Sequence, residues 1–238
     1  MNIKIVTWNM DYWKNKKLNK DIWDYFLNNI DADIYLFQES NPPEHIKKDS
    51  NLIWNKIDKN RNWGSGIYSK KYNLSQETIN TKFNGSLTIA NTVINNKKLT
   101  FISLYGLMTD GYSIPNLHSM LSDLSPLFYG KLNGKRNIIL GGDLNASIQF
   151  DLIYKYNNSH KIFFDRLKDF NFFDAFDLTD KEYPVQTLRH KKSKVKWQND
   201  YFFMNKPIFK NIISCKVLEN DEIRRFSDHN PVLIEIKV

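Results

Sequence analysis

The sequence has a single cysteine, few glycines and prolines, and no long apolar run. Cys215 has no partner for a disulfide within the chain and no second thiolate for a zinc site, so we interpret it as a core residue. No apolar run is long enough to span a bilayer, and the first residues lack the apolar segment and the cleavage site of a signal peptide. We therefore expect a cytoplasmic protein.

The length and the composition fit one folded domain. The chain has 238 residues, of which 41% are hydrophobic, which is enough for a sizeable core and too apolar for a disordered chain. No low-complexity linker or short repeat divides it. We expect a single domain over residues 1–238, acting as a monomer without an obligate protein partner.

Basic residues outnumber acidic ones, and the difference bears on the partner. The formal net charge is +8, which favours a polyanion. An anionic membrane surface or a phosphorylated small molecule would also match the charge. We expect the partner to be nucleic acid, DNA in the first place, and no membrane.

Strand patterns outnumber helical patterns along the chain. Runs rich in β-branched and aromatic residues predict strands over residues 2–8, 34–37, 52–57, 66–69, 87–94, 99–105, 137–140, 201–204, 212–218 and 232–238. Apolar residues at helical spacing predict helices over residues 18–30, 113–130 and 162–170. Many strands with short connections indicate a layered α/β domain with strong antiparallel content.

The stretch NIILGGDLNAS, residues 137–147, joins a buried strand pattern to two useful polar side chains. Gly141 and Gly142 end the strand and permit a sharp turn or a close approach to a ligand. Asp143 and Asn145 are two residues apart, so in strand geometry both project to the same side. Taken alone, the segment favours a strand that runs into an Asx turn.

Further strand ends have polar side chains of the kind that phosphodiester cleavage needs. They are Asn9, Glu39, Asp200, and the Asp228-His229 pair of the turn SDHNP. Carboxylates suit the hard ion Mg²⁺, a second carboxylate can deprotonate an attacking water, and a histidine held by a carboxylate can face phosphoryl oxygens. Each residue alone also fits an ordinary turn, but the set predicts metal-dependent hydrolysis.

These motifs stand in the order found in the endonuclease/exonuclease/phosphatase superfamily. They are WN at 8–9, QES at 38–40, GDLN at 142–145, DYFF at 200–203 and SDHNP at 227–231, and they span nearly the whole chain. Within the superfamily, the chain looks most like the exonuclease III-type AP endonucleases. The resemblance implies a four-layer α/β sandwich, with two packed mixed, largely antiparallel sheets flanked by helices.

The resemblance also implies roles for the site residues. The implied ligands of Mg²⁺, with Mn²⁺ as an alternative ion, are Glu39, Asn9 and Asp228. The implied catalytic set comprises a base, an amide that places the water, a histidine with its orienting carboxylate and a tyrosine that contacts phosphate: Asp143, Asn145, His229, Asp200 and Tyr105.

Basic clusters adjoin the motifs, one of them at residues 14–20, and we expect them to bind backbone phosphates. The predicted nucleic-acid contacts are Arg189, Lys191, Lys192, Lys194, Lys196, Trp197, Arg224 and Arg225. A solvated charged loop is the alternative for each cluster. A packed loop aromatic is the alternative for Trp197, which otherwise matches a sugar-pocket residue of some AP endonucleases.

Two segments depart from the AP endonuclease pattern. GLMTDG follows Tyr105 in place of a Pro-Asn turn, and MDYWKNKK follows Asn9. These differences leave the chemistry intact and leave abasic-site specificity open. We therefore predict a divalent-metal-dependent phosphodiesterase that hydrolyses nucleic acid by in-line attack of water. The alternatives are a phosphoesterase of the same superfamily acting on RNA, a nucleotide, a phosphoinositide or a sphingolipid, and a nucleic-acid-binding module without turnover.

Overall fold

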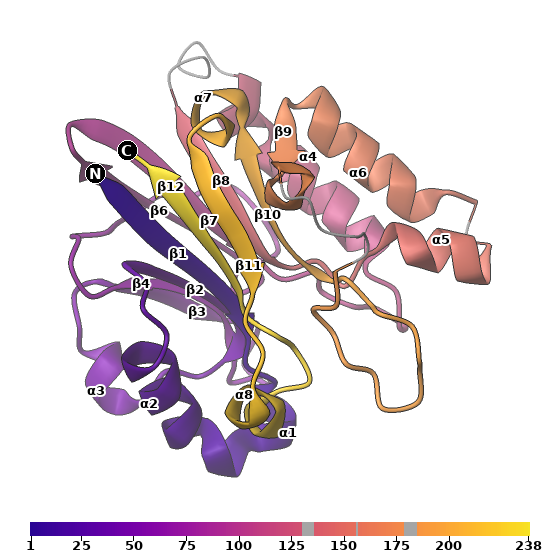
Figure 1. The fold of residues 1–238 in the computed structure, drawn as a ribbon, viewed down its shortest axis with the longest axis horizontal. Coiled ribbons are helices and arrows are strands. Elements are labelled where there is room, and N and C mark those ends of the chain that lie inside the picture. The colour runs from indigo at the N-terminus through magenta and orange to yellow at the C-terminus, as the bar shows by residue number, and fades with distance from the viewer. Residues whose placement is uncertain (130–135, 156, 179–184) are drawn as a thin grey trace.

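The computed structural model describes residues 1–129, 136–155, 157–178 and 185–238. Its strands form two six-stranded sheets, with the orders β11-β12-β1-β2-β4-β3 and β5-β6-β7-β8-β10-β9 (Figure 1). Neighbouring strands are antiparallel except in the pairs β1–β2 and β7–β8. The strands are β1 (Asn2–Asn9), β2 (Ile34–Ser40), β3 (Leu52–Lys56), β4 (Gly64–Ser69), β5 (Ser75–Gln76), β6 (Leu87–Ile94), β7 (Lys97–Leu104), β8 (Asn137–Asp143), β9 (Phe172–Asp174), β10 (Asp200–Asn205), β11 (Ile212–Val217) and β12 (Val232–Lys237).

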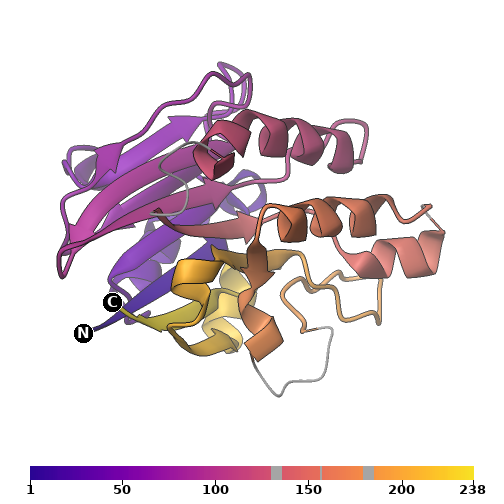
Figure 2. The ribbon, with the colours of Figure 1, turned by 90° about the horizontal axis from the view of Figure 1, so that it is seen from above.

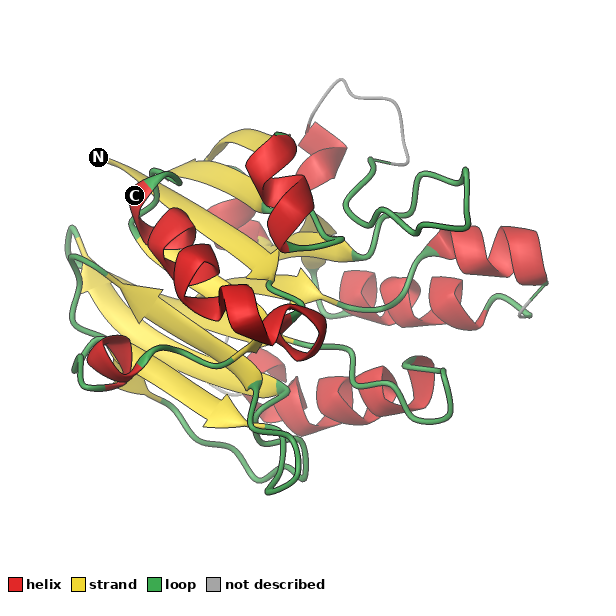
Figure 3. Cartoon of the chain, turned by 90° about the horizontal axis from the view of Figure 1, so that it is seen from below, coloured by secondary structure: helices red, strands yellow, loops and turns green. Residues whose placement is uncertain are grey.

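Helices flank the two sheets on both sides (Figures 2 and 3). They are α1 (Tyr12–Asn15), α2 (Asn19–Asn28), α3 (Glu44–Lys47), α4 (Ile114–Tyr129), α5 (Ile148–Tyr154), α6 (Ser159–Asp169), α7 (Lys206–Phe209) and α8 (Asp221–Phe226), with short 3-10 helices η1 (Lys16–Leu18) and η3 (Ala175–Leu178). Among the described residues, none of the helices has the length and apolar character needed to cross a membrane.

Apolar clusters between the layers hold the sandwich together. The middle cluster packs the two sheets face to face and includes Ile5, Phe101 and Phe202. An outer cluster packs α4 and α6 on the second sheet, with Phe163 buried in it, and another packs α2 on the first sheet around Trp23. This arrangement confirms the predicted fold of two packed, mixed sheets between helices.

Most predicted elements are present, although several end at other residues. β2 continues to Ser40, past the predicted end at 37, and α6 begins at Ser159, before the predicted 162. The prediction missed α5 and the other helices of one or two turns, because such short segments leave no clear helical periodicity. The predicted helix stop at Gly130 lies outside the described residues.

The two glycines of β8 are needed for close packing. A Cβ on Gly141 would lie 2.5 Å from a ring carbon of Phe202 in the middle cluster. A Cβ on Gly142, where φ is +153°, would lie 1.8 Å from the backbone oxygen of Leu104. The prediction that these glycines end the strand is wrong, because β8 runs on to Asp143, and the close approach that they permit is to the core and to the neighbouring strand β7.

The strand register brings polar strand ends to one rim of the sandwich. In the first sheet, Asn9 is paired with Gln38, so the next residue of β2, Glu39, lies beside the end of β1. In the second sheet, Asp143 at the end of β8 is paired directly with Asp200 at the start of β10. Because parallel strands of both sheets end at this rim, residues far apart in the chain meet there.

Candidate active site

A cleft of about 770 Å³ opens at this rim. Six of the predicted metal-binding and catalytic residues line it: Asn9, Glu39, Tyr105, Asn145, Asp228 and His229. The other two, Asp143 and Asp200, are fully buried and bond to residues that line the cleft. The sequence prediction therefore identified residues that the structure places together.

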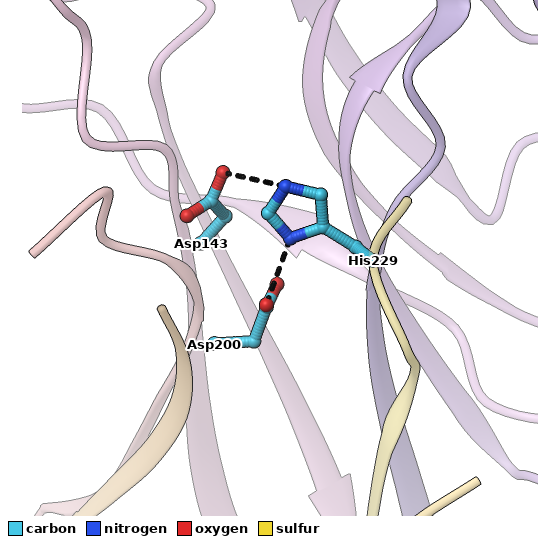
Figure 4. Close-up of side chains that lie close together, drawn as sticks. All are labelled: Asp143, Asp200 and His229. Atoms are coloured by element: carbon cyan, nitrogen blue, oxygen red, sulfur yellow. Dashed lines mark hydrogen bonds and ion pairs between the residues drawn. The ribbon is translucent and has the colours of Figure 1, made fainter. Parts of the chain in front are cut away.

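His229 lies between two buried carboxylates (Figure 4). Its Nδ1 is 2.8 Å from Oδ2 of Asp200, and its Nε2 is 3.8 Å from Oδ2 of Asp143. The backbone around the ring is fixed as well, because the His229 amide donates to Ser227 Oγ and its carbonyl oxygen accepts a bond from Trp8 Nε1. The SDHNP turn thus orients the imidazole from the backbone, and Asp200 orients it from the ring.

The carboxylates determine the charge of this histidine. Burial alone would lower the pKa of His229, but the negative charges of Asp200 and Asp143 outweigh burial and raise it to about 10. Burial raises the pKa of Asp143 from 3.8 to about 7, against the opposing effect of His229. The ring is therefore an imidazolium at neutral pH, next to a carboxyl group that exchanges its proton near pH 7.

The NIILGGDLNAS stretch turns at Asn145, so the predicted strand geometry does not reach that residue: β8 ends at Asp143, and Asn145 has φ of 47°. Oδ1 of Asp143 accepts the Asn145 amide proton at 2.8 Å, which is the predicted Asx turn. The same turn places Asn145 in the cleft, where its Nδ2 donates to Gly106 O at 3.2 Å. The local turn therefore holds the two proposed water-handling side chains in position.

Glu39 adopts a backbone conformation that glutamate rarely takes. The β2–β4 register shifts between Phe37 and Ser40, and Glu39 in this irregularity has φ of 43°. A left-handed backbone at such a residue costs free energy and is found most often at functional sites. The bulge turns the carboxylate of a buried strand toward the cleft.

Asn9 holds two carboxylates together. Its Nδ2 donates to Glu39 Oε1 at 3.0 Å and to Asp143 Oδ2 at 2.8 Å, while its Oδ1 accepts the backbone N–H of Asp11. In this arrangement the Asn9 oxygen is bonded to the backbone of Asp11, and the amide group holds the two carboxylates in position.

Asp11 is a site residue that sequence reasoning missed. It lines the cleft, is 4% exposed and has φ of 46°, and its Oδ1 is buried without a hydrogen-bond partner among the described residues. Burial first, and then the charge of Asp228, raise its pKa to about 7. The available signal was its place two residues after Asn9, the same spacing as Asp143 and Asn145.

The site fits a divalent cation. Like Oδ1 of Asp11, Oε2 of Glu39 is buried without a partner among the described residues, and such carboxylate oxygens are costly unless a cation or proton meets them. A second group, Asp143, Asp200 and His229, has potential ligand atoms within 4.8 Å of one another. We favour Glu39 and Asp11 for a hard ion, because Mg²⁺ prefers carboxylate oxygens, whereas His229 Nδ1 and both oxygens of Asp143 already form hydrogen bonds within the protein.

Lys14 bridges the acidic residues at the mouth of the cleft. Its Nζ is 3.1 Å from Asp11 Oδ2 and 2.9 Å from Asp228 Oδ2. Burial acts to raise the pKa of Asp228, but His229 and Lys14 outweigh it and lower that pKa. Asp228 is therefore a carboxylate at neutral pH, as its predicted role in metal binding requires.

Tyr105 lies against the acidic wall of the cleft. It is 6% exposed, and the ring of Trp63 packs edge-on against it at 5.6 Å. Burial first, and then the charges of Glu39 and Asp143, raise the pKa of Tyr105 well above its ordinary value. Its hydroxyl thus keeps its proton and can donate a hydrogen bond to phosphate.

Most of the predicted basic contacts form a second groove of about 1030 Å³ that shares Asp11, Lys14, His190 and Asp228 with the cleft. Its basic lining residues are Lys14, Arg189, Lys191, Lys192, Arg224 and Arg225. Arg189 bonds to Asn230 and to the Ser227 carbonyl, and Arg224 lies 2.8 Å from Glu219, so both are held within the protein. Lys194 and Lys196 do not line the groove.

The position of Trp197 corrects its predicted contact with nucleic acid. The ring is 4% exposed, donates to Ser193 Oγ and stacks on Phe150 at 4.5 Å. A ring covered in this way offers no face to a base, so the alternative of a packed loop aromatic describes it. Phe150, which lines the cleft over it, lies in the short helix that the sequence did not predict.

A comparison with protein families identifies the group to which the chain belongs. The sequence model of the Endonuclease/Exonuclease/phosphatase family matches residues 6–229. The chain belongs to this family. It is a phosphoesterase of this family and has the α/β sandwich fold. Comparison with curated proteins found no match.

Solved structures share the fold of this family member at low sequence identity. They include AP endonuclease LMAP from Leishmania major, with a TM-score of 0.74, 16% identity, and coverage of 100% of this chain and 88% of that one. A humanized D. rerio TDP2 has a TM-score of 0.72 and 18% identity, covering 100% and 99%. The 3′ phosphatase NExo from Neisseria, bound to a product DNA hairpin, has a TM-score of 0.66 and 16% identity, covering 99% and 100%.

Proposed function

We propose that the protein is a Mg²⁺-dependent phosphodiesterase that hydrolyses nucleic acid, DNA in the first place, in the cytoplasm. The observation that supports this proposal best is that His229 lies between two buried carboxylates and lines the same cleft as Glu39 and Asp11, each of which has a carboxylate oxygen without a partner among the described residues. Mn²⁺ is the alternative ion, since it accepts the same oxygen ligands.

In the proposed mechanism of in-line attack by water, each of four residues has a separate role. Asp143 accepts the proton of the attacking water, and its raised pKa suits proton exchange near neutral pH. Asn145 places the water and the phosphate. His229 donates to the phosphoryl oxygens as negative charge develops there, and Asp200 keeps the ring protonated and oriented.

Glu39, Asp11 and Asp228 would hold the cation, which supplies charge neutralisation for the phosphate and the leaving oxygen. Tyr105, which keeps its proton, donates to a phosphate oxygen near the leaving group. The proposed monomer needs no residue from a second chain for these roles.

Two further observations support a nucleic-acid substrate. The basic groove continues from the cleft, so an extended polyanion can occupy both. The solved structures with a similar fold include an AP endonuclease and a phosphatase bound to DNA.

Glu39→Gln and His229→Gln test the proposal, with Glu44→Gln in α3 as a matched control on the exposed surface. Substrates are abasic duplex, plain single- and double-stranded DNA, RNA, and bis(p-nitrophenyl) phosphate, each with Mg²⁺ and with EDTA. We expect cleavage of polynucleotide by wild type and control in Mg²⁺ only. Full activity of either site variant would refute the assigned roles.

The same panel separates the alternatives. Cleavage of the generic diester without cleavage of any polynucleotide would favour a small phosphoester as the substrate. Salt-sensitive DNA binding without cleavage in any divalent metal would favour a binding module. Cleavage of RNA but not DNA would assign RNA as the substrate and leave the proposed hydrolysis mechanism unchanged.

A further inference from the structure

Asn199 is a buried polar residue in the cleft to which the catalytic scheme gives no role. It is 2% exposed and lines the cleft, and its Oδ1 has no hydrogen-bond partner among the described residues. A buried amide without a partner reduces stability unless a ligand supplies the missing bond. The position therefore calls for a functional explanation.

The backbone holds Asn199 rigidly beside the reacting groups. Its N–H donates to Thr187 Oγ1 at 2.9 Å, and its carbonyl oxygen accepts the Leu144 N–H at 2.8 Å. Leu144 precedes Asn145, and Asn199 itself precedes Asp200. Asn199 lines the same cleft as Asn145 and His229, so the nucleoside of a phosphate held by those two residues can reach it.

The cleft that Asn199 lines also has apolar and aromatic side chains, among them Phe150, Tyr154 and Leu188. Trp197 lies two residues earlier, and Phe150 stacks on it at 4.5 Å. Leu188, which also lines the cleft, forms isolated bridges with Trp197 and with His229. A neutral carboxamide among such side chains suits a sugar or a base, whereas phosphates are bound by cationic groups.

We propose that Asn199 forms a nucleoside subsite, in which its carboxamide hydrogen-bonds the base or the ribose 2′-hydroxyl of the nucleotide at the scissile phosphate. Either end of the amide can meet the ligand after a half turn about its last bond. The subsite makes Asn199 a specificity-determining residue that selects against a nucleotide lacking its base. This inference rests on the proposed function and adds its substrate selectivity.

The test compares wild type, Asn199→Leu and the control Asn28→Leu, whose site is exposed in α2. Leucine keeps the number and branching of the heavy atoms of asparagine and removes the hydrogen bond. Substrates are an oligodeoxynucleotide, the same backbone with base-free tetrahydrofuran residues, an oligoribonucleotide of the same sequence, and bis(p-nitrophenyl) phosphate, which has no nucleoside.

We expect Asn199→Leu to lower kcat/KM about tenfold on the substrates that form this hydrogen bond and to leave kcat/KM on bis(p-nitrophenyl) phosphate at the wild-type value. The control variant Asn28→Leu should have wild-type kcat/KM on every substrate. Loss on both base-bearing polymers but not on the base-free one assigns the bond to the base. Loss on RNA alone assigns it to the 2′-hydroxyl. The melting temperature of Asn199→Leu should equal or exceed that of wild type, because the variant removes an unsatisfied buried amide.

Equal kcat/KM of wild type and Asn199→Leu on every polymer would overturn the inference. An equal decrease of kcat/KM on all four substrates, or any decrease on the base-free backbone, would overturn it as well. A lowered melting temperature with uniform loss would show a structural role instead. If the wild type cleaves none of the substrates, the proposed function itself fails, a result distinct from an active wild type with an unaffected variant.

Discussion

Replacing Asp200 by asparagine tests whether this carboxylate keeps His229 protonated. The two side chains meet at 2.8 Å, whereas Asp143 lies farther from the ring, at 3.8 Å. The pKa of His229 is about 10, against an ordinary value of 6.5. The difference corresponds to a net preference for the imidazolium of roughly 5 kcal/mol, to which Asp200 contributes the larger electrostatic share.

We expect Asp200→Asn to lower the pKa of His229 by roughly 2 units, to about 8. A group with a raised pKa stays protonated until the pH rises through that pKa. At pH 9 the protonated fraction should therefore fall from about nine-tenths to about one-tenth, while at pH 7 it stays high in both proteins. The ratio of wild-type to variant kcat/KM should be about tenfold larger at pH 9 than at pH 7.

The assay is hydrolysis of bis(p-nitrophenyl) phosphate in saturating Mg²⁺ from pH 6 to pH 10. A misoriented ring lowers the rate by the same factor at every pH, so only the change of the ratio with pH reports the charge. Nuclear magnetic resonance of ¹⁵N-labelled histidine, assigned with His229→Gln, measures the pKa directly. A ratio that stays constant with pH, or a wild-type ring that titrates near its ordinary value, would refute the reasoning.

Three further predictions concern other parts of the molecule. In metal-free protein at pH 8, Asp11→Asn should raise the melting temperature by a few degrees and should reduce the additional rise that Mg²⁺ causes. The pKa of this buried acid is about 7, so the stability that its protonated form contributes is lost as the pH rises from 3.8 through 7. Scanning fluorimetry should therefore show no difference between variant and wild type at pH 3. Replacing Lys191 and Lys192 by glutamine should reduce the salt slope of DNA binding by about 1 to 2, measured by fluorescence anisotropy, and an unchanged slope would remove both from the interface. Gly142→Ala should lower the free energy of unfolding, measured by urea titration, by roughly 2 kcal/mol or more, because its Cβ would meet a backbone oxygen at 1.8 Å. The control Gly111→Ala, where φ is +77° and no neighbour lies within 4 Å, should lower it by only about 1 kcal/mol.

Sequence periodicity was sufficient to predict ten of the twelve strands in the described residues, but not the short strands β5 and β9. β-branched runs followed by polar turn residues mark the ends of β1, β2 and β8, and the parallel pairs bring those ends to one rim. The direct pairing of Asp143 with Asp200 was not predictable in this way. It depends on the register of two strands that are far apart in the chain, and local patterns do not contain register.

The parts that the sequence did not reveal depend on backbone conformation and on short segments. Glu39 and Asp11 reach the cleft from left-handed backbone, a conformation that hydrophobic periodicity does not indicate. Phe150 reaches it from α5, which is too short to show helical spacing. Trp197 was assigned to the interface from its position, but burial under a neighbouring ring is a tertiary property.

The catalytic group is assembled across the sandwich, which leads to a last prediction. His229 precedes β12 of the first sheet, whereas Asp200 and Asp143 belong to the second, so their geometry depends on the core between the sheets. Phe101→Leu in that core and Phe163→Leu under the outer helices each remove a buried ring and should cost similar stability, roughly 1–2 kcal/mol. Only Phe101→Leu should also lower kcat, by about tenfold, because small shifts between the sheets displace the imidazole from its carboxylates. Equal kcat in two variants of matched stability would show that the rim holds its geometry independently of the packing between the sheets.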